Sequence, residues 1–348
     1  MNSIIAFIFV FSIMVFFHEL GHFLSAKAFG VKVYKFAFGF GPKIFGFKKN
    51  ETEYNICLVP LGGYVKMAGE FGQTEKESGV EEEEVSGRFD KKPVSVRALI
   101  VAMGPLMNII TSILIFSLIF LLNGIPMTTT VIESVLENGP AAESGILRGD
   151  EIIQINSIEV NNTDEIAKII SQSIGKELNI VINRDDIIYE KYITPEYNEE
   201  YERGMIGISF TIETRKLNVF SSLGEGIKTT IFIIKMIFTN TLEMITGKIP
   251  VEVAGPLGIA QMTGEFARLG FMSLLYFTAI LSIFIGIFNL IPIPILDGGQ
   301  IILLCIEKIR GKPLETKKMN LIYLIGISLM LILFIFATYS DITRIFFK

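Results

Sequence analysis

Phe17-His18-Glu19-Leu20-Gly21-His22-Phe23 carries both histidines of the 348-residue chain. If this stretch is helical, residues four apart lie on one face, so the imidazoles of His18 and His22 can reach one ion with Glu19 beside it. Two randomly placed histidines would have this separation, with a Glu directly after the first, roughly once in several thousand chains. The pattern therefore predicts a metal site.

The histidine pair lies inside an apolar run, Ile4 to Leu24, that is long enough to cross a bilayer. A histidine in such a place can also be an ordinary core residue. Two imidazoles and a carboxylate are costly in hydrocarbon unless they serve a purpose, however, which favours metal binding. The run lacks a basic segment before it and a small-residue cleavage site, so residues 1–26 are predicted to be a retained first span rather than a signal peptide.

The composition predicts a polytopic α-helical membrane protein. Half of the residues are hydrophobic, the mean hydropathy is +0.52 and Trp is absent, which is too apolar for an ordinary soluble chain. The net charge of −5 gives no basic footprint for nucleic acid, so the expected partner is the lipid bilayer and not DNA or RNA. Cys57 and Cys305 lie far apart without metal-ligand spacing and receive no role.

The region after the first span is predicted to form β-hairpins. Residues 30–68 alternate between apolar and polar positions around the turn Gly39-Phe40-Gly41-Pro42. Their aromatic side chains favour a membrane-associated region beside the histidine pair, and a plain cytosolic hairpin fits the pattern equally well. Residues 69–93 contain the run Glu81 to Glu84, which predicts an acidic, solvated linker on the cytoplasmic side.

A second span is predicted at 94–124. It contains Gly104-Pro105 and Asn108, and a proline and a polar amide at membrane depth indicate a kink and a side chain that faces the helix bundle. Simple helix packing by small residues is the alternative.

Residues 127–213 are more polar and predict a compact β-rich domain inserted between two spans. One helix is expected from Thr163 to Ser173, with Thr163 or Asp164 as its cap. The series Gly139-Pro140-Ala141-Ala142 and Gly149-Asp150-Glu151-Ile152-Ile153-Gln154-Ile155-Asn156 resembles PDZ domains, whose groove binds peptide ends by strand addition.

The last part of the chain predicts two more spans, at 270–300 and 318–340. Residues 218–262 hold an apolar stretch interrupted by Lys235 and Glu243, which indicates an interfacial amphipathic helix or, as the alternative, another span. Lysines and arginines gather after the first span and between the last two, and the positive-inside rule places both groups in the cytoplasm. Four crossings satisfy this rule, with the inserted domain on the outer side.

The third metal ligand is predicted to be a carboxylate, because a catalytic zinc takes three protein ligands and the chain has no third histidine. In a four-span topology the first and third spans end on the same side, so Asp297 lies at the depth of His22. Its context, Asn289-Leu290-Ile291-Pro292-Ile293-Pro294-Ile295-Leu296-Asp297-Gly298-Gly299, breaks the helix, as backbone that lines a wet cavity can. A helix-ending Asp at the interface is the alternative.

The chain resembles the bacterial site-2 proteases of the regulator-of-sigma-E protease group. The resemblance covers nearly the whole length and rests on five features in the family's order: His18 to His22, Gly104-Pro105-Leu106-Met107-Asn108, one PDZ-like domain, Gly255-Pro256-Leu257-Gly258-Ile259-Ala260 and Asn289 to Gly299. It implies that the hairpins offer an edge strand to substrate and that Asn289 lies near substrate in a loop shaped by Pro292. We also expect Asn108 to contact substrate.

The expected function is intramembrane proteolysis with Zn²⁺ as cofactor. Zinc held by His18, His22 and Asp297 activates water, and Glu19 is the expected general base. The resemblance implies single-span substrates such as anti-sigma factors or signal-peptide remnants. It also implies a bacterial inner-membrane protein, with an extracytoplasmic PDZ domain and an active site near the cytoplasmic side. The alternatives are a membrane-bound gluzincin, whose third ligand is a Glu, and a membrane PDZ scaffold with a structural metal.

Overall fold

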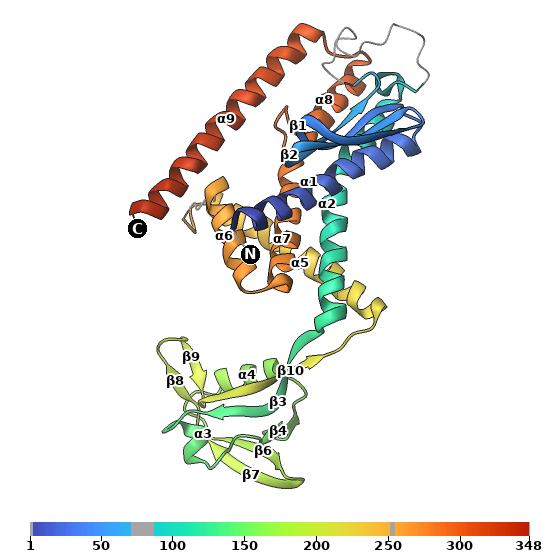
Figure 1. Cartoon of the computed structure of the whole chain (residues 1–348). Coiled ribbons are helices and arrows are strands. Elements are labelled where there is room, and N and C mark those ends of the chain that lie inside the picture. Colours follow the sequence, from blue (N-terminus) through green and yellow to red (C-terminus); the bar gives the residue numbers. More distant parts are fainter. Residues whose placement is uncertain (1–2, 71–86, 251–254, 348) are drawn as a thin grey trace. The chain divides into compact units, whose positions relative to one another are not determined.

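The computed structural model describes residues 3–70, 87–250 and 255–347. The chain divides into two compact units, unit 1 (Met1–Phe120 and Asn218–Lys348) and unit 2 (Leu121–Leu217). Figure 1 shows that unit 1 is mainly helical and that unit 2 is built around a sheet. Most of the predicted acidic linker, residues 71–86, lies outside the described residues.

Unit 1 contains long apolar helices. Among the described residues, four helices are long and apolar enough to cross a membrane: Ser3–Ala28, Val94–Asn123, Phe271–Asn289 and Lys317–Arg344. The helices of this unit are α1 (Ser3–Ala28), the short 3-10 helix η2 (Phe89–Lys91), α2 (Val94–Asn123), α5 (Val219–Ile245), α6 (Pro256–Arg268), α7 (Phe271–Asn289), α8 (Asp297–Arg310) and α9 (Thr316–Phe347).

The helix α5 is not one of the four candidate spans. One stripe of residues four or three apart is buried, and its members are Ser222, Gly226, Thr230, Ile233 and Ile237. This stripe packs on α2 and α7, where Ile233 and Ile237 join Phe116 and Ile283 in one apolar cluster. The exposed positions of α5 combine apolar side chains, such as Phe220 and Phe232, with charged ones, Lys228 and Lys235, as an amphipathic helix at a membrane surface requires. Its location at such a surface stays a prediction.

The strands β1 (Val33–Lys49) and β2 (Thr52–Met67) form more than a simple hairpin. Phe36 pairs with both Tyr54 and Val65, so the first half of β1 is the middle of the sheet. The second half of β1 pairs with residues 52–57 only, and the second half of β2 pairs with residues 33–38 only. Within the described residues, the stretch from Gly63 to Met67 is therefore an open edge of this sheet, and α1 packs against the sheet (Figure 1).

The third span and Asp297 are separated, which corrects one detail of the sequence-based topology. The helix α7 ends at Asn289, residues 290–296 are not helical, and Asp297 is the first residue of α8. The proline-rich loop breaks the helix as predicted, because Pro292 and Pro294 cannot donate backbone hydrogen bonds. Asp297 therefore begins a new helix instead of ending the span.

The helix α9 is held at one end by a buried carboxylate. Asp341 is fully buried and accepts hydrogen bonds from the backbone N–H groups of Gly255 (3.0 Å) and Gly258 (2.8 Å) at the start of α6. These are N–H groups that the helix itself leaves without partners. Along most of α9, only 6% of the apolar window is buried, so nearly all of its surface is available to lipid.

Unit 2 is a β-rich domain with the order β10-β3-β4-β6-β7 in its main sheet. Its elements are β3 (Ile125–Val135), α3 (Pro140–Glu143), β4 (Glu151–Ile155), β5 (Ile158–Glu159), α4 (Thr163–Ser171), β6 (Leu178–Arg184), β7 (Ile187–Ile193), β8 (Glu196–Asn198), β9 (Arg203–Met205) and β10 (Ile208–Arg215). The alternating residues Leu178, Ile180 and Ile182 enter one core with Ile166 of α4. The cap of α4 is Asn162, whose side chain accepts from Glu165 N–H, and not Thr163 or Asp164.

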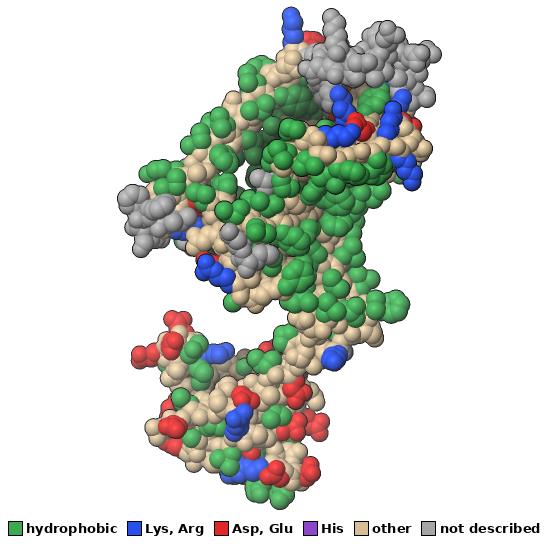
Figure 2. Space-filling view, viewed as in Figure 1, with side chains coloured by type: hydrophobic (Ala, Val, Ile, Leu, Met, Phe, Trp, Pro, Cys, Tyr) green, Lys and Arg blue, Asp and Glu red, His purple; other side chains and the backbone are tan. Residues whose placement is uncertain are grey.

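The surface differs between the two units. In Figure 2 hydrophobic side chains cover much of the visible face of unit 1, whereas acidic and basic side chains gather on unit 2. A contiguous apolar surface of this extent is typical of a membrane-embedded part, and a mixed charged surface is typical of a domain in water.

Candidate metal centre

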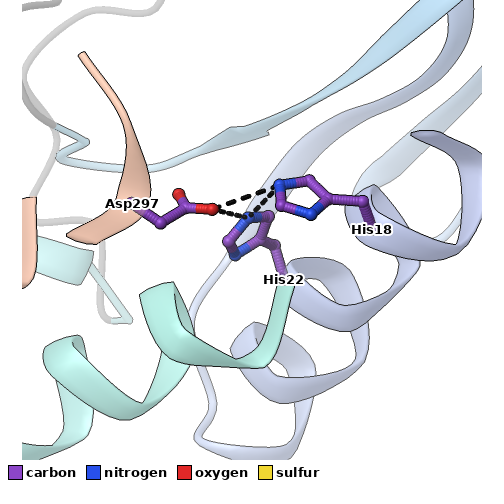
Figure 3. Close-up of side chains that lie close together, drawn as sticks. All are labelled: His18, His22 and Asp297. Atoms are coloured by element: carbon purple, nitrogen blue, oxygen red, sulfur yellow. Dashed lines mark hydrogen bonds and ion pairs between the residues drawn. The ribbon is translucent and has the colours of Figure 1, made fainter. Parts of the chain in front are cut away.

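Three side chains from two distant parts of the chain meet in unit 1. His18 and His22 lie one turn apart on α1, and Asp297 reaches them from the start of α8 (Figure 3). Their side chains are only 11% to 12% exposed. The predicted convergence of residues 22 and 297 is therefore present in the structure.

The distances between the three side chains suit one small ion. His18 Nε2 and His22 Nε2 are 3.4 Å apart, and Asp297 Oδ2 lies 3.2 Å from the first and 3.6 Å from the second. Zinc bonds of about 2.1 Å in a tetrahedron place neighbouring ligand atoms about 3.4 Å apart. Asp297 Oδ2 is buried and has no hydrogen-bond partner in the described part of the chain. The donor set and its spacing therefore fit zinc.

The site is open on one side. Among the described residues, one group of His, Cys, Asp or Glu side chains brings its ligand atoms this close together, and it consists of His18, His22 and Asp297. Three side chains leave one tetrahedral position free, which is the arrangement of a catalytic zinc; a structural zinc is usually closed by four side chains.

His22 is oriented by the helix α2. Its Nδ1 lies 3.0 Å from the backbone carbonyl of Ile100, which can only accept, so Nδ1 carries the proton and Nε2 presents a lone pair to the metal position. Gly104 makes room for the ring, since a Cβ at this position would lie 2.2 Å from His22 Nε2. The glycine of the Gly104-Pro105 pair is thus explained by the site and not by helix flexibility.

Asn108 lies behind the site instead of facing a substrate. Its side chain is fully buried, and its amide nitrogen is 3.3 Å from His18 Nδ1, while its Oδ1 has no partner in the described structure. Exchange of the amide oxygen and nitrogen lets His18 Nδ1–H donate to Oδ1, which leaves His18 Nε2 with a lone pair for the metal position. This placement differs from the expected substrate contact, because a fully buried side chain is out of a substrate's reach.

A polar cavity of about 280 Å³ opens beside the three side chains. Glu19 and Asn289 line it, as expected for a general base and a substrate contact. Asn289 uses one amide hydrogen in a 3.0 Å bond to the carbonyl of Ile285. Pro292 is exposed on the loop between α7 and α8 and does not line the cavity.

The open sheet edge borders the same cavity. Tyr64, Val65 and Met67 of β2 line it. Gly63 lies directly beside Glu19, because a Cβ on this glycine would be 3.2 Å from Glu19 Cγ. An extended peptide that paired with this edge would therefore pass the metal position.

Two further polar residues of the cavity, Glu70 and Gln300, escaped the sequence-based prediction. Glu70 was assigned to the acidic linker, because it precedes an acidic run of similar composition. Burial of this carboxyl raises its pKa from 4.5 to about 7, which the hydrogen bond from Met67 N–H only partly offsets. Such a carboxyl differs from the solvated acids that a linker contains.

Comparison with known proteins agrees with this geometry. Residues 6–333 match the sequence profile of peptidase family M50. The chain belongs to peptidase family M50. The regulator of sigma-W protease RasP of Bacillus subtilis is 33% identical, with 99% of both chains covered. The zinc metalloprotease RasP of Bacillus licheniformis is 35% identical, with 99% of this chain and all of the relative covered. A putative zinc metalloprotease of Clostridium acetobutylicum is 34% identical over 98% and 97% of the two chains.

This M50 peptidase is a zinc metalloprotease of the site-2 protease type, as the resemblance predicted. Membership in the family also decides against the scaffold alternative and against a gluzincin, which is a different class of metalloprotease. Among the described residues, the carboxylate that converges with the two histidines is Asp297 and not a Glu. PDZ domains of SdrC-like proteins resemble part of the chain. The domain from Listeria innocua covers 26% of this chain and 99% of its own at 24% identity, with a TM-score of 0.22. At this score the assignment of unit 2 as a PDZ domain stays a prediction.

Proposed function

We propose that this peptidase cleaves single-span membrane proteins within their membrane segments, in regulated intramembrane proteolysis. The proposed substrate classes are anti-sigma-factor-like proteins and signal-peptide remnants. The observation that carries the proposal is the position of the site: two imidazoles of an apolar helix long enough to span a bilayer meet a carboxylate at zinc spacing. The printed name of the Bacillus subtilis relative, a regulator of sigma-W protease, supports the anti-sigma-factor class.

The side chains of the site divide the chemical work. His18, His22 and Asp297 are the proposed ligands, and zinc supplies the Lewis acidity that activates water and a carbonyl at neutral pH. Glu19, which lines the same cavity, takes the proton of the attacking water and passes it to the leaving amine. Asn108 holds His18 in the correct tautomer, as the carbonyl of Ile100 does for His22.

Substrate binding is proposed to use the open edge of the sheet. A helical membrane segment hides its carbonyls in internal hydrogen bonds, so the segment must unwind before hydrolysis. Pairing with the backbone of residues 63–67 replaces some of the lost bonds and presents the extended chain to Glu19. Asn289 donates its second amide hydrogen to the substrate backbone or to the developing oxyanion, and Pro292 shapes the loop that carries it.

The proposed topology has four crossings in the bacterial inner membrane. The positively charged residues between α7 and α9, among them Lys308 and Arg310 in the last turn of α8, are placed in the cytoplasm together with the end of α1. Unit 2 then lies outside the cell membrane and is proposed to act as a PDZ domain that excludes substrates whose external part has not been trimmed.

The test uses the purified full-length protein in liposomes with single-span reporters that carry short external parts. We expect cleavage within the membrane segment, located by mass spectrometry. Glu19→Gln should reduce the rate by about 10²- to 10⁴-fold without loss of zinc, because only the proton transfer is removed. Glu51→Gln, which changes an exposed carboxyl in the turn between β1 and β2, is the matched control and should cleave normally. A Glu19→Gln protein that cleaves at the wild-type rate would refute the assignment.

A further inference from the structure

Glu70 is placed at the end of the sheet edge by a specific turn. Gly69 has a φ of +71°, and a Cβ at this position would lie 2.3 Å from Asp90 Oδ1, so the turn requires a glycine. The turn brings Glu70 back to the last residue of β2, where its Oε2 accepts a 3.1 Å hydrogen bond from Met67 N–H. The carboxylate is therefore held in place and is not a loose surface acid.

The carboxylate of Glu70 faces the metal cavity and has no ion-pair partner among the described residues. Glu70 lines the same cavity as His18, Glu19 and Asp297. In the described part of the chain, no lysine or arginine forms an ion pair with it, and the Met67 N–H bond is its one hydrogen bond there. Burial raises the pKa of this carboxyl to about 7, because the hydrogen bond from Met67 N–H and the nearby charge of Lys66 offset only part of the desolvation. A cationic group in the cavity would stabilise its charged form.

The position of Glu70 along the sheet edge determines which residue of a bound peptide would lie beside it. Gly63 marks the level of Glu19, and Met67 lies four residues further along the strand. Four residues of extended chain span about 13 Å. A peptide that pairs with this edge and is cut beside Glu19 would bring a residue about four positions from the scissile bond next to Glu70.

This end of the edge lies near the end of α1. Ala68, the residue after β2, donates a backbone hydrogen bond to the carbonyl of Lys32, four residues after α1 ends at Ala28. In the proposed topology this is the cytoplasmic side. Membrane proteins carry an excess of lysine and arginine next to the cytoplasmic end of a span. A substrate flank that enters the cavity here thus brings positive charge towards Glu70.

We propose that Glu70 forms a carboxylate subsite that binds a lysine or arginine on the cytoplasmic flank of the substrate, about four residues from the scissile bond. The subsite selects substrates and fixes the register in which the unwound segment meets the zinc ligands. The inference rests on the proposed function, because it needs an extended substrate on the sheet edge.

The test compares two reporters in liposomes, one with a single arginine in the cytoplasmic flank and one with glutamine at the same position. This position is varied from three to five residues from the cleavage site. For the wild-type protein we expect kcat/KM to be about ten- to hundredfold higher with arginine at one of these positions, as charge-assisted bonds predict. Glu70→Gln should lose this preference, so that its kcat/KM for the arginine reporter falls to its own value for the glutamine reporter. Glu70→Arg should prefer a glutamate reporter.

The outcomes separate this inference from the proposed function. Zinc content and thermal midpoint establish that each variant is folded, and Glu51→Gln serves as the matched loss of one carboxyl, in the turn between β1 and β2. If the wild-type protein cleaves both reporters equally well, or if Glu70→Gln slows both by the same factor, the subsite is refuted and intramembrane proteolysis still stands. If neither reporter is cleaved more by the wild type than by Glu19→Gln, the proposed function itself fails.

Discussion

The three proposed ligand residues reach one position for two different reasons. His18 and His22 are neighbours because an α-helix places residues four apart on one face. Asp297 lies 275 residues after His22 in the sequence. It reaches the histidines because α8 packs into the same apolar cluster as the end of α1. The local pair was predictable from spacing alone. The distant ligand was predictable only through an argument about membrane depth, supported by a family resemblance.

The supporting residues of the site gave weaker signals. Ile100 acts through its backbone carbonyl, which no sequence pattern can reveal. Asn108 was recognised as a buried polar residue, but its partner depends on how α1 packs on α2, and the expected substrate contact was therefore misplaced. Glu70 was missed because a single carboxyl beside an acidic run has no distinguishing pattern.

The hydrogen bond between Asn108 and His18 yields the first residue-scale prediction. Asn108→Ala should weaken zinc affinity by about 10- to 100-fold, as loss of a group that orients a metal-bound histidine typically does. Asn108→Asp should retain most of the affinity, because a carboxylate still accepts from His18 Nδ1–H. Competition with a zinc chelator measures the affinities of the purified proteins.

Ser112→Ala is the matched control for Asn108. Ser112 is equally buried on the next turn of α2 and donates to the carbonyls of Asn108 and Ala279 without touching His18. We expect normal zinc affinity for this variant. Wild-type affinity in Asn108→Ala would show that Asn108 only packs between helices.

At the scale of single elements, α8 is the part that the sequence described least well. The broken helix between Asn289 and Asp297 followed from Pro292 and Pro294, but Asp297 was expected to end the third span. The residues Asp297-Gly298-Gly299, followed by apolar residues at helical spacing, are a helix start signal that could have located α8. Local sequence patterns predicted the hairpins but not the way in which the two halves of β1 and the two halves of β2 form one sheet. Phe36 pairs with both Tyr54 and Val65, and the second of these pairings depends on tertiary contacts.

The helix α8 is fixed to α2 by a buried ion pair. Arg97 donates to Glu307 through two bonds of 3.1 and 2.5 Å, and the side chains are 6% and 14% exposed. Arg97→Gln leaves a buried carboxylate without a partner, which should destabilise the protein by about 3–5 kcal/mol and lower zinc affinity, because Asp297 begins the same helix. Thermal unfolding and chelator competition measure the two effects. Arg97→Lys should restore only part of both, since lysine cannot form the paired bonds.

The exposed pair Glu225–Lys228 on α5 provides the comparison for this prediction. Lys228→Gln should change stability by less than about 1 kcal/mol. If Arg97→Gln lowered the thermal midpoint but left zinc affinity unchanged, the ion pair would stabilise the fold without positioning Asp297.

At the scale of the whole molecule, unit 2 has its own acid-sensitive centre. Asp150 is fully buried and receives two bonds from Arg184, at 2.6 and 2.8 Å, and one of 2.8 Å from Leu147 N–H. Burial alone would raise the pKa of Asp150, but the Arg184 and Leu147 bonds outweigh it and hold the pKa below 3.8. The charged form is thus favoured by folding.

The direction of the shift determines the pH dependence. A lowered pKa in the folded state contributes stability that is fully present above pH 3.8 and is lost as the pH falls through the folded-state value. Asp150→Asn should therefore destabilise unit 2 at pH 7 by about 3–5 kcal/mol, and the difference from wild type should shrink below pH 3.8. Hydrogen exchange of β4 and β6 in the full-length protein measures this. A difference that stays constant across this range would contradict the assignment.

The division of the molecule into a membrane part and a polar domain was largely predictable. Long apolar runs mark α1, α2, α7 and α9, and alternating residues mark the strands of unit 2, because both signals are local. The number of crossings and the side on which unit 2 lies depend on the membrane and remain predictions.

The central claim is that two histidines of α1 and one aspartate of α8 hold a single catalytic zinc. The most direct test is the zinc content per chain of the purified wild-type, Glu19→Gln and Asp297→Ala proteins, measured by elemental mass spectrometry. We predict about one zinc in the first two and almost none in Asp297→Ala, which keeps only two ligands. A folded Asp297→Ala protein that retains a full zinc complement would contradict the account.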